Sequence, residues 1–169
     1  MDLKGKTVVV SGGNSGLGWE ISELILERKG KVIILGKNPK KVNGAAVVVC
    51  DLRDYDQIQK VKDQLVNADV LINCAGVIAY SPLETHDPKN IRDIIETNLL
   101  GTIYLTQAVL EKMLLKNSGT IINISSTTGL PTGGHPNQAV YAASKFGVYG
   151  FTESLKKEID DRKKKAHRS

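Results

Sequence analysis

Short β-branched runs separated by longer helical segments constrain this fold more than any other feature of the sequence. The runs have strand length and are almost continuously apolar, whereas half-exposed strands alternate apolar and polar residues. Continuous runs are typical of a parallel sheet that helices cover on both faces, so the sequence predicts an α/β fold built from βαβ units. The runs are residues 6–11, 31–36, 45–50, 69–74 and 119–125, and the helical segments between them are 16–29, 54–67 and 88–116.

The 169 residues predict a single domain, because no internal repeat or low-complexity linker interrupts them. A hydrophobic share of 41% and a charged share of 24% are typical of soluble globular proteins. No apolar run approaches the roughly 20 residues that a membrane span needs, and the N-terminus lacks the layout of a signal peptide. We therefore expect a cytoplasmic protein. Cys50 and Cys74 make no disulfide framework, and the three histidines lack metal-ligand spacing.

The net charge of +5 is concentrated near the C-terminus. Five of the 23 basic residues lie within 162–169, and the other 18 balance the 18 acidic residues. A basic helix end complements the helix dipole and is usually just solvated. The sequence therefore favours a solvated basic helical tail at 156–169. Binding of this tail to nucleic acid or to an acidic surface is the alternative.

Two connections between the predicted strands differ in length. Residues 38–45 leave barely enough room for a helix, so a short turn or a single helical turn is expected there. Residues 126–140 are a loop rich in Gly, Pro, Ser and Thr, between the fifth strand and the last helix. A long loop beside the carboxyl ends of the strands is a suitable place for a substrate rim.

A glycine-rich turn connects the first strand to the first helix. Gly12, Gly16 and Gly18 have the spacing GxxxGxG, which is related to the dinucleotide-binding pattern GxGxxG. Glycines allow a tight turn and a close approach of the backbone to a pyrophosphate. The N-terminus of the following helix offers its N–H groups to the same phosphates. The position after a strand and before an amphipathic helix favours nucleotide binding over a purely structural turn.

The end of the second strand indicates which dinucleotide is preferred. An NAD site usually has Asp or Glu there, to bind the ribose 2′-hydroxyl. This chain has Gly36 at that position, followed by Lys37, Lys40 and Lys41, and no acidic residue between 30 and 43. A 2′-phosphate would suit this basic segment, so NADP is favoured over NAD. The alternative is that these lysines are solvated loop residues.

Polar residues occur at three further positions where they could serve catalysis. Asn98 falls on the apolar face of segment 88–116, where it could bond the backbone of a neighbour or hold an ordered water. Ser125 and Ser126 end the fifth strand, where a hydroxyl can face a ligand or simply make a turn. Tyr141 and Lys145 share one helix face at i, i+4, and a nearby ammonium group favours the phenolate that proton exchange requires.

These features occur in one order: the glycine turn, the sequence NCAG at 73–76, Asn98, the sequence NISS at 123–126, and YAASK at 141–145. The set resembles the short-chain dehydrogenase/reductase family over residues 6 to about 158. The resemblance implies a Rossmann-type three-layer fold with a parallel sheet of about five strands, lacking the last two strands usual in the family. The edge of the sheet at the fifth strand would then be uncovered, and an uncovered edge favours association with another chain.

The resemblance also implies roles for individual residues. In this reading, Tyr141 exchanges the proton, Ser126 rather than Ser125 polarises the carbonyl, Lys145 binds the nicotinamide ribose and assists Tyr141, and Asn98 holds a water in a proton relay. Lys37 would bind the cofactor phosphate, and Tyr141 and Lys145 would touch the cofactor too. The remaining cofactor contacts would be Ser11, Gly12, Asn14, Ser15, Gly16, Leu17 and Gly18 at the turn, Asp51 and Leu52 at the adenine, and Asn73, Ala75 and Gly76 at the ribose.

The activity implied is an NAD(P)-dependent oxidoreductase that interconverts a carbonyl compound and a secondary alcohol by hydride transfer, with NADPH preferred. A possible homo-oligomer is implied as well. Family members are usually longer, with substrate-covering segments after the last helix. The chain would then be a truncated product, a fragment, or a short form completed by a partner. The alternative function is a catalytically impaired dinucleotide-binding or scaffold protein with the same fold.

Overall fold

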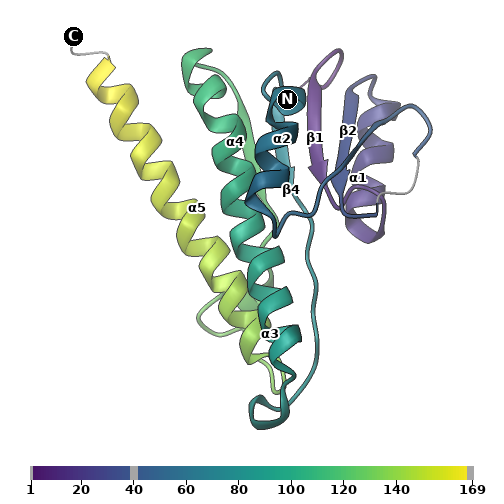
Figure 1. Cartoon of the computed structure of the whole chain (residues 1–169). Helices are drawn as coiled ribbons and strands as arrows, with labels where there is room; N and C mark the ends of the chain where they lie inside the picture. The colour runs from purple at the N-terminus through teal and green to yellow at the C-terminus, as the bar shows by residue number, and fades with distance from the viewer. Residues whose placement is uncertain (1, 39–41, 167–169) are drawn as a thin grey trace.

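The computed structural model describes residues 2–38 and 42–166 (Figure 1). Five parallel strands form one sheet in the order β3-β2-β1-β4-β5. Each strand lies within one of the predicted runs, so the predicted α/β fold with a five-stranded parallel sheet is confirmed. The strands are β1 (Thr7–Ser11), β2 (Lys31–Gly36), β3 (Ala46–Val49), β4 (Val70–Asn73) and β5 (Thr120–Asn123).

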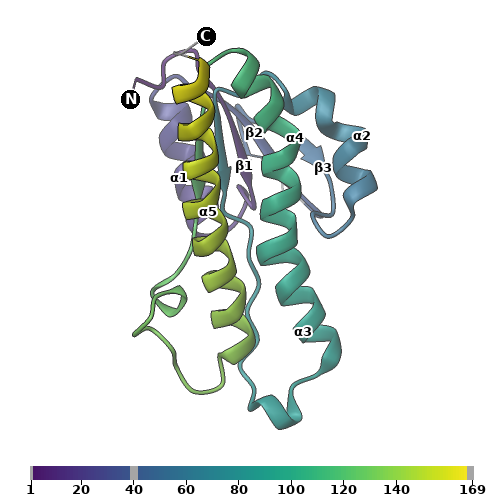
Figure 2. The same cartoon turned by 90° about the vertical axis from the view of Figure 1, so that its left-hand side faces the viewer.

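The helices cover the sheet on both faces. Figures 1 and 2 show α1 on one side of the sheet and α2, α4 and α5 on the other. The predicted helical segment 88–116 is divided into α3 and α4 by a π-helical turn, η2. The helices are α1 (Gly16–Glu27), α2 (Tyr55–Leu65), α3 (Pro88–Ile95), α4 (Gly101–Leu115) and α5 (Ala139–Ala166), with short helical turns η1 (Leu83–Thr85), η2 (Glu96–Leu100) and η3 (Thr127–Gly129).

The central strand β1 supplies both halves of the core. Val9 packs in one buried cluster, which includes Leu105 of α4, while Val8 and Val10 pack in the other, which includes Ile25 of α1. All three valines are fully buried. Because successive side chains of a strand point to opposite faces, a strand covered on both sides needs apolar residues at every position. This requirement explains why the sequence shows continuous apolar runs.

Two helices begin at residues that cap their first turn. The Asp54 carboxylate accepts a hydrogen bond from the backbone N–H of Gln57 at the start of α2. The Asp87 carboxylate accepts one from the N–H of Lys89 at the start of α3, and Pro88 occupies the first helical position. Such caps satisfy N–H groups that the helix itself leaves without partners.

The connection between β2 and β3 is short, as expected. Its described residues contain no helix and turn at Gly44, while Pro39, Lys40 and Lys41 lie outside the described residues. At the other end of the chain α5 extends to Ala166, so the predicted basic tail is helical that far, and its residues 160–165 are exposed. Residues 167–169, with His167 and Arg168 of the tail, are also outside the described part.

The order of the strands locates the ligand crevice. Chain connections leave β1 toward β2 on one side and reach β4 on the other, so the strand order reverses between β1 and β4. In open parallel sheets, ligands bind outside the carboxyl ends of the strands at such a reversal. Within residues 2–38 and 42–166, no helix is long and apolar enough to span a membrane, and no three His, Cys, Asp or Glu side chains gather as metal ligands.

Candidate active site

A cavity of about 600 Å³ lies at this reversal, within the usual size range of ligand sites. It extends from the glycine turn after β1, past the end of β3, to the side chains of Tyr141 and Lys145 on α5. Thirteen of the predicted site residues line it: Gly12, Asn14, Ser15, Gly16, Leu17, Gly18, Lys37, Asp51, Leu52, Ala75, Gly76, Tyr141 and Lys145. The cavity lining also includes residues that sequence reasoning did not assign: Gly36, Arg53, Cys74, Val77, Ile78, Asp93, Thr97, Ile124 and Ser125.

The glycine turn is packed too closely for side chains at two positions. Gly12 has a φ of +67°, and a Cβ there would lie 2.9 Å from the Cα of Ala75. A Cβ on Gly18 would lie only 2.2 Å from the carbonyl oxygen of Gly12. Ser15 precedes α1 without a side-chain cap bond to the first helical turn. The first residues of α1, Gly16, Leu17 and Gly18, line the cavity, and a helix N-terminus at this position suits a phosphate.

Ser11 lies outside the cavity lining and bonds two residues that form it. Its buried Oγ accepts hydrogen bonds from the backbone N–H groups of Cys74, at 3.0 Å, and Ala75, at 3.1 Å. These bonds fasten the segment after β4 to the end of β1. Ser11 is outside the cavity lining, so a direct contact between Ser11 and a cofactor stays a prediction.

Replacing Ser11 with Ala should therefore destabilise the chain. The variant leaves the partly buried N–H groups of Cys74 and Ala75 without this acceptor, so we expect the free energy of unfolding to fall by about 1–2 kcal/mol. Urea denaturation measures this quantity. Ser15→Ala is the matched control, because Ser15 is exposed and makes no cap bond, and its effect should stay within about 0.5 kcal/mol. Equal stability of the two variants would contradict the role given to Ser11.

Asn73 also lies outside the cavity lining. Its side-chain amide is buried and donates to Thr106 Oγ1 at 3.1 Å and to Asn123 Oδ1 at 2.8 Å. Asn123 in turn donates to Thr152 Oγ1 of α5. This network joins β4, β5, α4 and α5 behind the cavity. A direct contact between Asn73 and a ribose stays a prediction.

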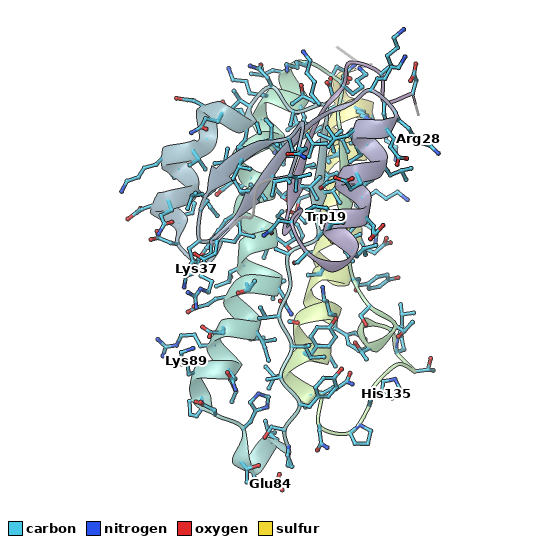
Figure 3. The ribbon with its side chains drawn as sticks, turned by 90° about the vertical axis from the view of Figure 1, so that its right-hand side faces the viewer. Trp19, Arg28, Lys37, Glu84, Lys89 and His135 are labelled. Atoms are coloured by element: carbon cyan, nitrogen blue, oxygen red, sulfur yellow. The ribbon has the colours of Figure 1, made fainter. Side chains whose placement is uncertain are left out.

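Charged side chains surround the cavity near the ends of β2 and β3. The guanidinium of Arg53 bonds both carboxylate oxygens of Asp51 and reaches Asp93 on α3. This contact lowers the pKa of the Asp51 carboxyl to about 2. Lys37 lies 3.5 Å from the same carboxylate. Figure 3 shows Lys37 at the carboxyl end of the sheet and Lys89 nearby on α3.

Tyr141 and Lys145 occupy one face of α5, as their spacing predicts. The Nζ atom of Lys145 lies 5.7 Å from the centre of the Tyr141 ring and donates a 2.8 Å hydrogen bond to the carbonyl oxygen of Ile124. Lys145 is only 5% exposed, and burial lowers the pKa of its ammonium group. Within the described residues, no carboxylate forms an ion pair with it.

The two serines after β5 differ in their contacts. Ser125 lines the cavity, and its hydroxyl donates to the carbonyl oxygen of Lys145 at 3.0 Å. Ser126, the predicted catalytic serine, is outside the lining and caps η3, where its Oγ accepts hydrogen bonds from Thr128 N–H and Thr128 Oγ1. The assignment of Ser126 to catalysis therefore stays a prediction.

Asn98 lies in the π-helical turn and is 1% exposed. Its Oδ1 accepts a bond from Val77 N–H at 2.8 Å, while its Nδ2 donates to Val77 O at 2.9 Å and to Ser144 Oγ at 3.1 Å. The side chain therefore fixes the wall of the cavity at Val77 and ties it to α5. A Cβ on Gly76 would meet Asn98 Oδ1 at 3.4 Å and Lys145 Nζ at 3.6 Å, so these two polar groups converge at one point of the cavity.

Comparison with known proteins agrees with this geometry. A sequence model described as short chain dehydrogenase matches residues 6–165. The chain is 37% identical to a 3-oxoacyl-[acyl-carrier-protein] reductase FabG of Vibrio cholerae, over 96% of this chain and 70% of that protein. It is 33% identical to the carbonyl reductase family member 4 of Xenopus tropicalis, over 93% of this chain and 70% of that protein.

Solved structures show the same fold. A metagenomic short-chain oxidoreductase in complex with NADP superposes with a TM-score of 0.87 at 29% identity, over 95% of this chain and 79% of that one. A short-chain dehydrogenase of Leptospira borgpetersenii with bound NAD⁺ superposes with a TM-score of 0.83 at 28% identity, over 91% of this chain and 65% of that one. The glycine turn, Tyr141 and Lys145 line one cavity, and Asn98 lies outside the lining but bonds Val77 in its wall. With this site and these matches, the chain belongs to the short-chain dehydrogenase/reductase family.

Proposed function

We propose that this chain is an NADP-preferring oxidoreductase that interconverts a carbonyl compound and a secondary alcohol. The observation that carries the proposal is one cavity shared by the glycine turn and by Tyr141 and Lys145. The turn at Gly12 and Gly18 leaves no room for side chains and suits the pyrophosphate of a dinucleotide. A nicotinamide dinucleotide, when bound, supplies the hydride chemistry that amino acids lack.

The chain's own residues would handle the proton. The Tyr141 hydroxyl donates a proton to the carbonyl oxygen in reduction and recovers it in oxidation. The Lys145 ammonium, 5.7 Å from the ring centre, favours the phenolate left by proton donation and can bind a ribose hydroxyl. Ser126 would polarise the carbonyl by donating its O–H, because both of its bonds with Thr128 are accepted by Oγ and leave that donor for the substrate.

Asn98 would complete a proton path to solvent. A carboxamide oxygen accepts two hydrogen bonds, and Asn98 Oδ1 accepts one, from Val77 N–H. The second lone pair would accept from a water, and the Lys145 ammonium, which lies near the same point beside Gly76, would donate to that water. Asn98 therefore both positions the cavity wall and holds one step of the proposed relay.

The preference for NADP is proposed from the end of β2. Gly36 supplies no carboxylate for a ribose 2′-hydroxyl, and Lys37 presents a largely exposed ammonium group to the same region of the cavity. An ammonium group attracts a 2′-phosphate. One similar structure contains NADP and another contains NAD⁺, so membership of the family does not decide between the two dinucleotides. The proposed preference therefore rests on Gly36 and Lys37.

Binding and oxidation of NADPH by the chain test this function. NADPH fluorescence titration should show saturable binding, and a panel of ketones and aldehydes should include at least one that is reduced. In Gly18→Ala the new Cβ would lie 2.2 Å from a backbone oxygen, so the turn must shift, and we expect NADPH affinity to fall about 100-fold. Gly150→Ala on α5 is the control, since a Cβ there meets nothing within 4 Å. Absence of NADPH binding to the unmodified chain would contradict the proposal.

A second candidate is a dinucleotide-binding protein without turnover. The position of Ser126 favours it, because this serine lies outside the cavity lining. Saturable NADPH binding, with no oxidation across the carbonyl panel, would support this candidate over the oxidoreductase.

A further inference from the structure

Arg53 lines the cavity between Lys37 and α3, and the function proposed above gives it no role. Its side chain is only 27% exposed. The Nε and Nη2 atoms donate to Oδ1 and Oδ2 of Asp51 at 2.9 and 2.7 Å, and its backbone N–H donates to Asp51 Oδ1 at 3.1 Å. The Nη1 atom donates to Asp93. A paired, two-pronged contact of this kind holds both charged groups in a fixed geometry.

The Asp51 carboxylate has a second cationic neighbour. Lys37 Nζ lies 3.5 Å from Asp51 Oδ2, but the Lys37 side chain is 62% exposed, whereas that of Asp51 is 18% exposed. Arg53 therefore makes the shorter bonds with Asp51. Lys37 makes a longer and more solvated contact with the same carboxylate. Without Arg53, the carboxylate would have Lys37 as its nearest cation, and its charge would stand uncompensated beside any anion that Lys37 binds.

We propose that Arg53 determines dinucleotide specificity by neutralising Asp51, which leaves Lys37 available to bind a 2′-phosphate. This inference rests on the proposed function, since it assigns a role within the same dinucleotide site. Arg53 acts through Asp51 and Lys37 and needs no contact with the phosphate. Its effect should therefore appear only with the ligand that carries the 2′-phosphate.

Calorimetric titration with NADP⁺ and NAD⁺ tests the proposal, with 2′,5′-ADP and AMP as the corresponding fragments. In Arg53→Gln, the uncompensated Asp51 should lower the NADP⁺ to NAD⁺ affinity ratio about tenfold, with the affinity for NAD⁺ nearly unchanged. In Asp51→Asn/Arg53→Gln, one anion and one cation are both removed, so the local net charge equals that of the original chain. The affinity ratio should then return to within about threefold of its original value.

Lys89→Gln is the matched control, because it removes one cation that pairs with Asp93 but lies outside the cavity lining. Its affinity ratio should stay within about twofold of the original. An unchanged ratio in Arg53→Gln would overturn the inference. So would a double variant as weak for NADP⁺ as Arg53→Gln, since that result indicates a direct contact between Arg53 and the phosphate. Failure of the unmodified chain to bind either dinucleotide would contradict the proposed function itself, and the inference with it.

Discussion

Replacing Tyr141 with Phe is expected to reduce carbonyl turnover by about 1000-fold while NADPH affinity stays within about threefold. The phenolic hydroxyl is the group proposed to move the proton, and a positioned acid–base group contributes about 10²–10⁴-fold to a rate. The ring itself remains, so the packing of α5 against the cavity is retained. Steady-state NADPH oxidation measures the first quantity and fluorescence titration the second.

Tyr149→Phe supplies the control on the same helix. Tyr149 is 46% exposed and lies outside the cavity lining, so loss of its hydroxyl should leave both turnover and NADPH affinity unchanged. The proposed mechanism would be wrong if Tyr141→Phe retained more than about a tenth of the original turnover. A loss of NADPH binding in that variant would instead assign Tyr141 mainly to the binding of the dinucleotide.

The strands could be predicted because each is short, apolar and bounded by turn residues. Burial on both faces demands apolar side chains at every position of β1, and this local requirement is visible in the sequence. The π-helical turn at Glu96–Leu100 could not be predicted in this way. It depends on contacts from outside the helix: the Asn98 side chain bonds Val77, and a Cβ on Gly101 would lie 2.9 Å from Leu52 Cβ.

The candidate site was predictable to a similar degree. Spacing alone placed Tyr141 and Lys145 on one face of a helix, and the glycine pattern after the first strand predicted a nucleotide site at Gly12 and Gly18. That these residues line one cavity follows from the strand order, which the structure shows. The pairing of Arg53 with Asp93 joins residues 40 positions apart on different elements, and nothing in either local sequence indicates it. The charged residues that follow β3, Asp51 and Arg53, could still have identified Arg53 itself as a candidate site residue.

Polar side chains near the ends of strands were harder to interpret. Ser11 and Asn73 each follow the pattern of a ligand contact, yet each is buried and bonds other parts of the chain. The deciding quantity is the direction of the side chain. Successive residues of a strand point to opposite faces, and the sequence alone does not show which strand-end side chain turns toward the cavity and which toward the core.

Replacing Lys145 with Met should abolish turnover and at the same time stabilise the chain. The buried ammonium group has a backbone carbonyl as its hydrogen-bond partner and no ion pair among the described residues, so its desolvation is poorly compensated. Met has a similar length and no charge. We expect the free energy of unfolding to rise by about 1 kcal/mol near neutral pH, after the loss of the bond to Ile124 O is included.

This gain in stability should depend on pH in a defined direction. Burial lowers the pKa of Lys145 in the folded chain below its ordinary value of 10.5. Between the lowered pKa and 10.5, the unfolded chain binds more protons than the folded chain, so the stability of the original chain increases with pH in that window. Met does not titrate. The difference in unfolding free energy between the two proteins should therefore shrink as pH rises toward 10, as measured by urea denaturation at a series of pH values.

Lys157→Met on the exposed part of α5 provides the control, with a stability change within about 0.5 kcal/mol and no dependence of that change on pH. A Lys145→Met variant that is less stable than the original chain near neutral pH would show that the ammonium group stabilises the fold. A Lys145→Met variant that is more stable than the original chain would show that the ammonium group destabilises the fold. A lysine that lowers stability and lies beside Tyr141 in the cavity would support the proton chemistry proposed for it, because packing alone would favour an apolar side chain at position 145.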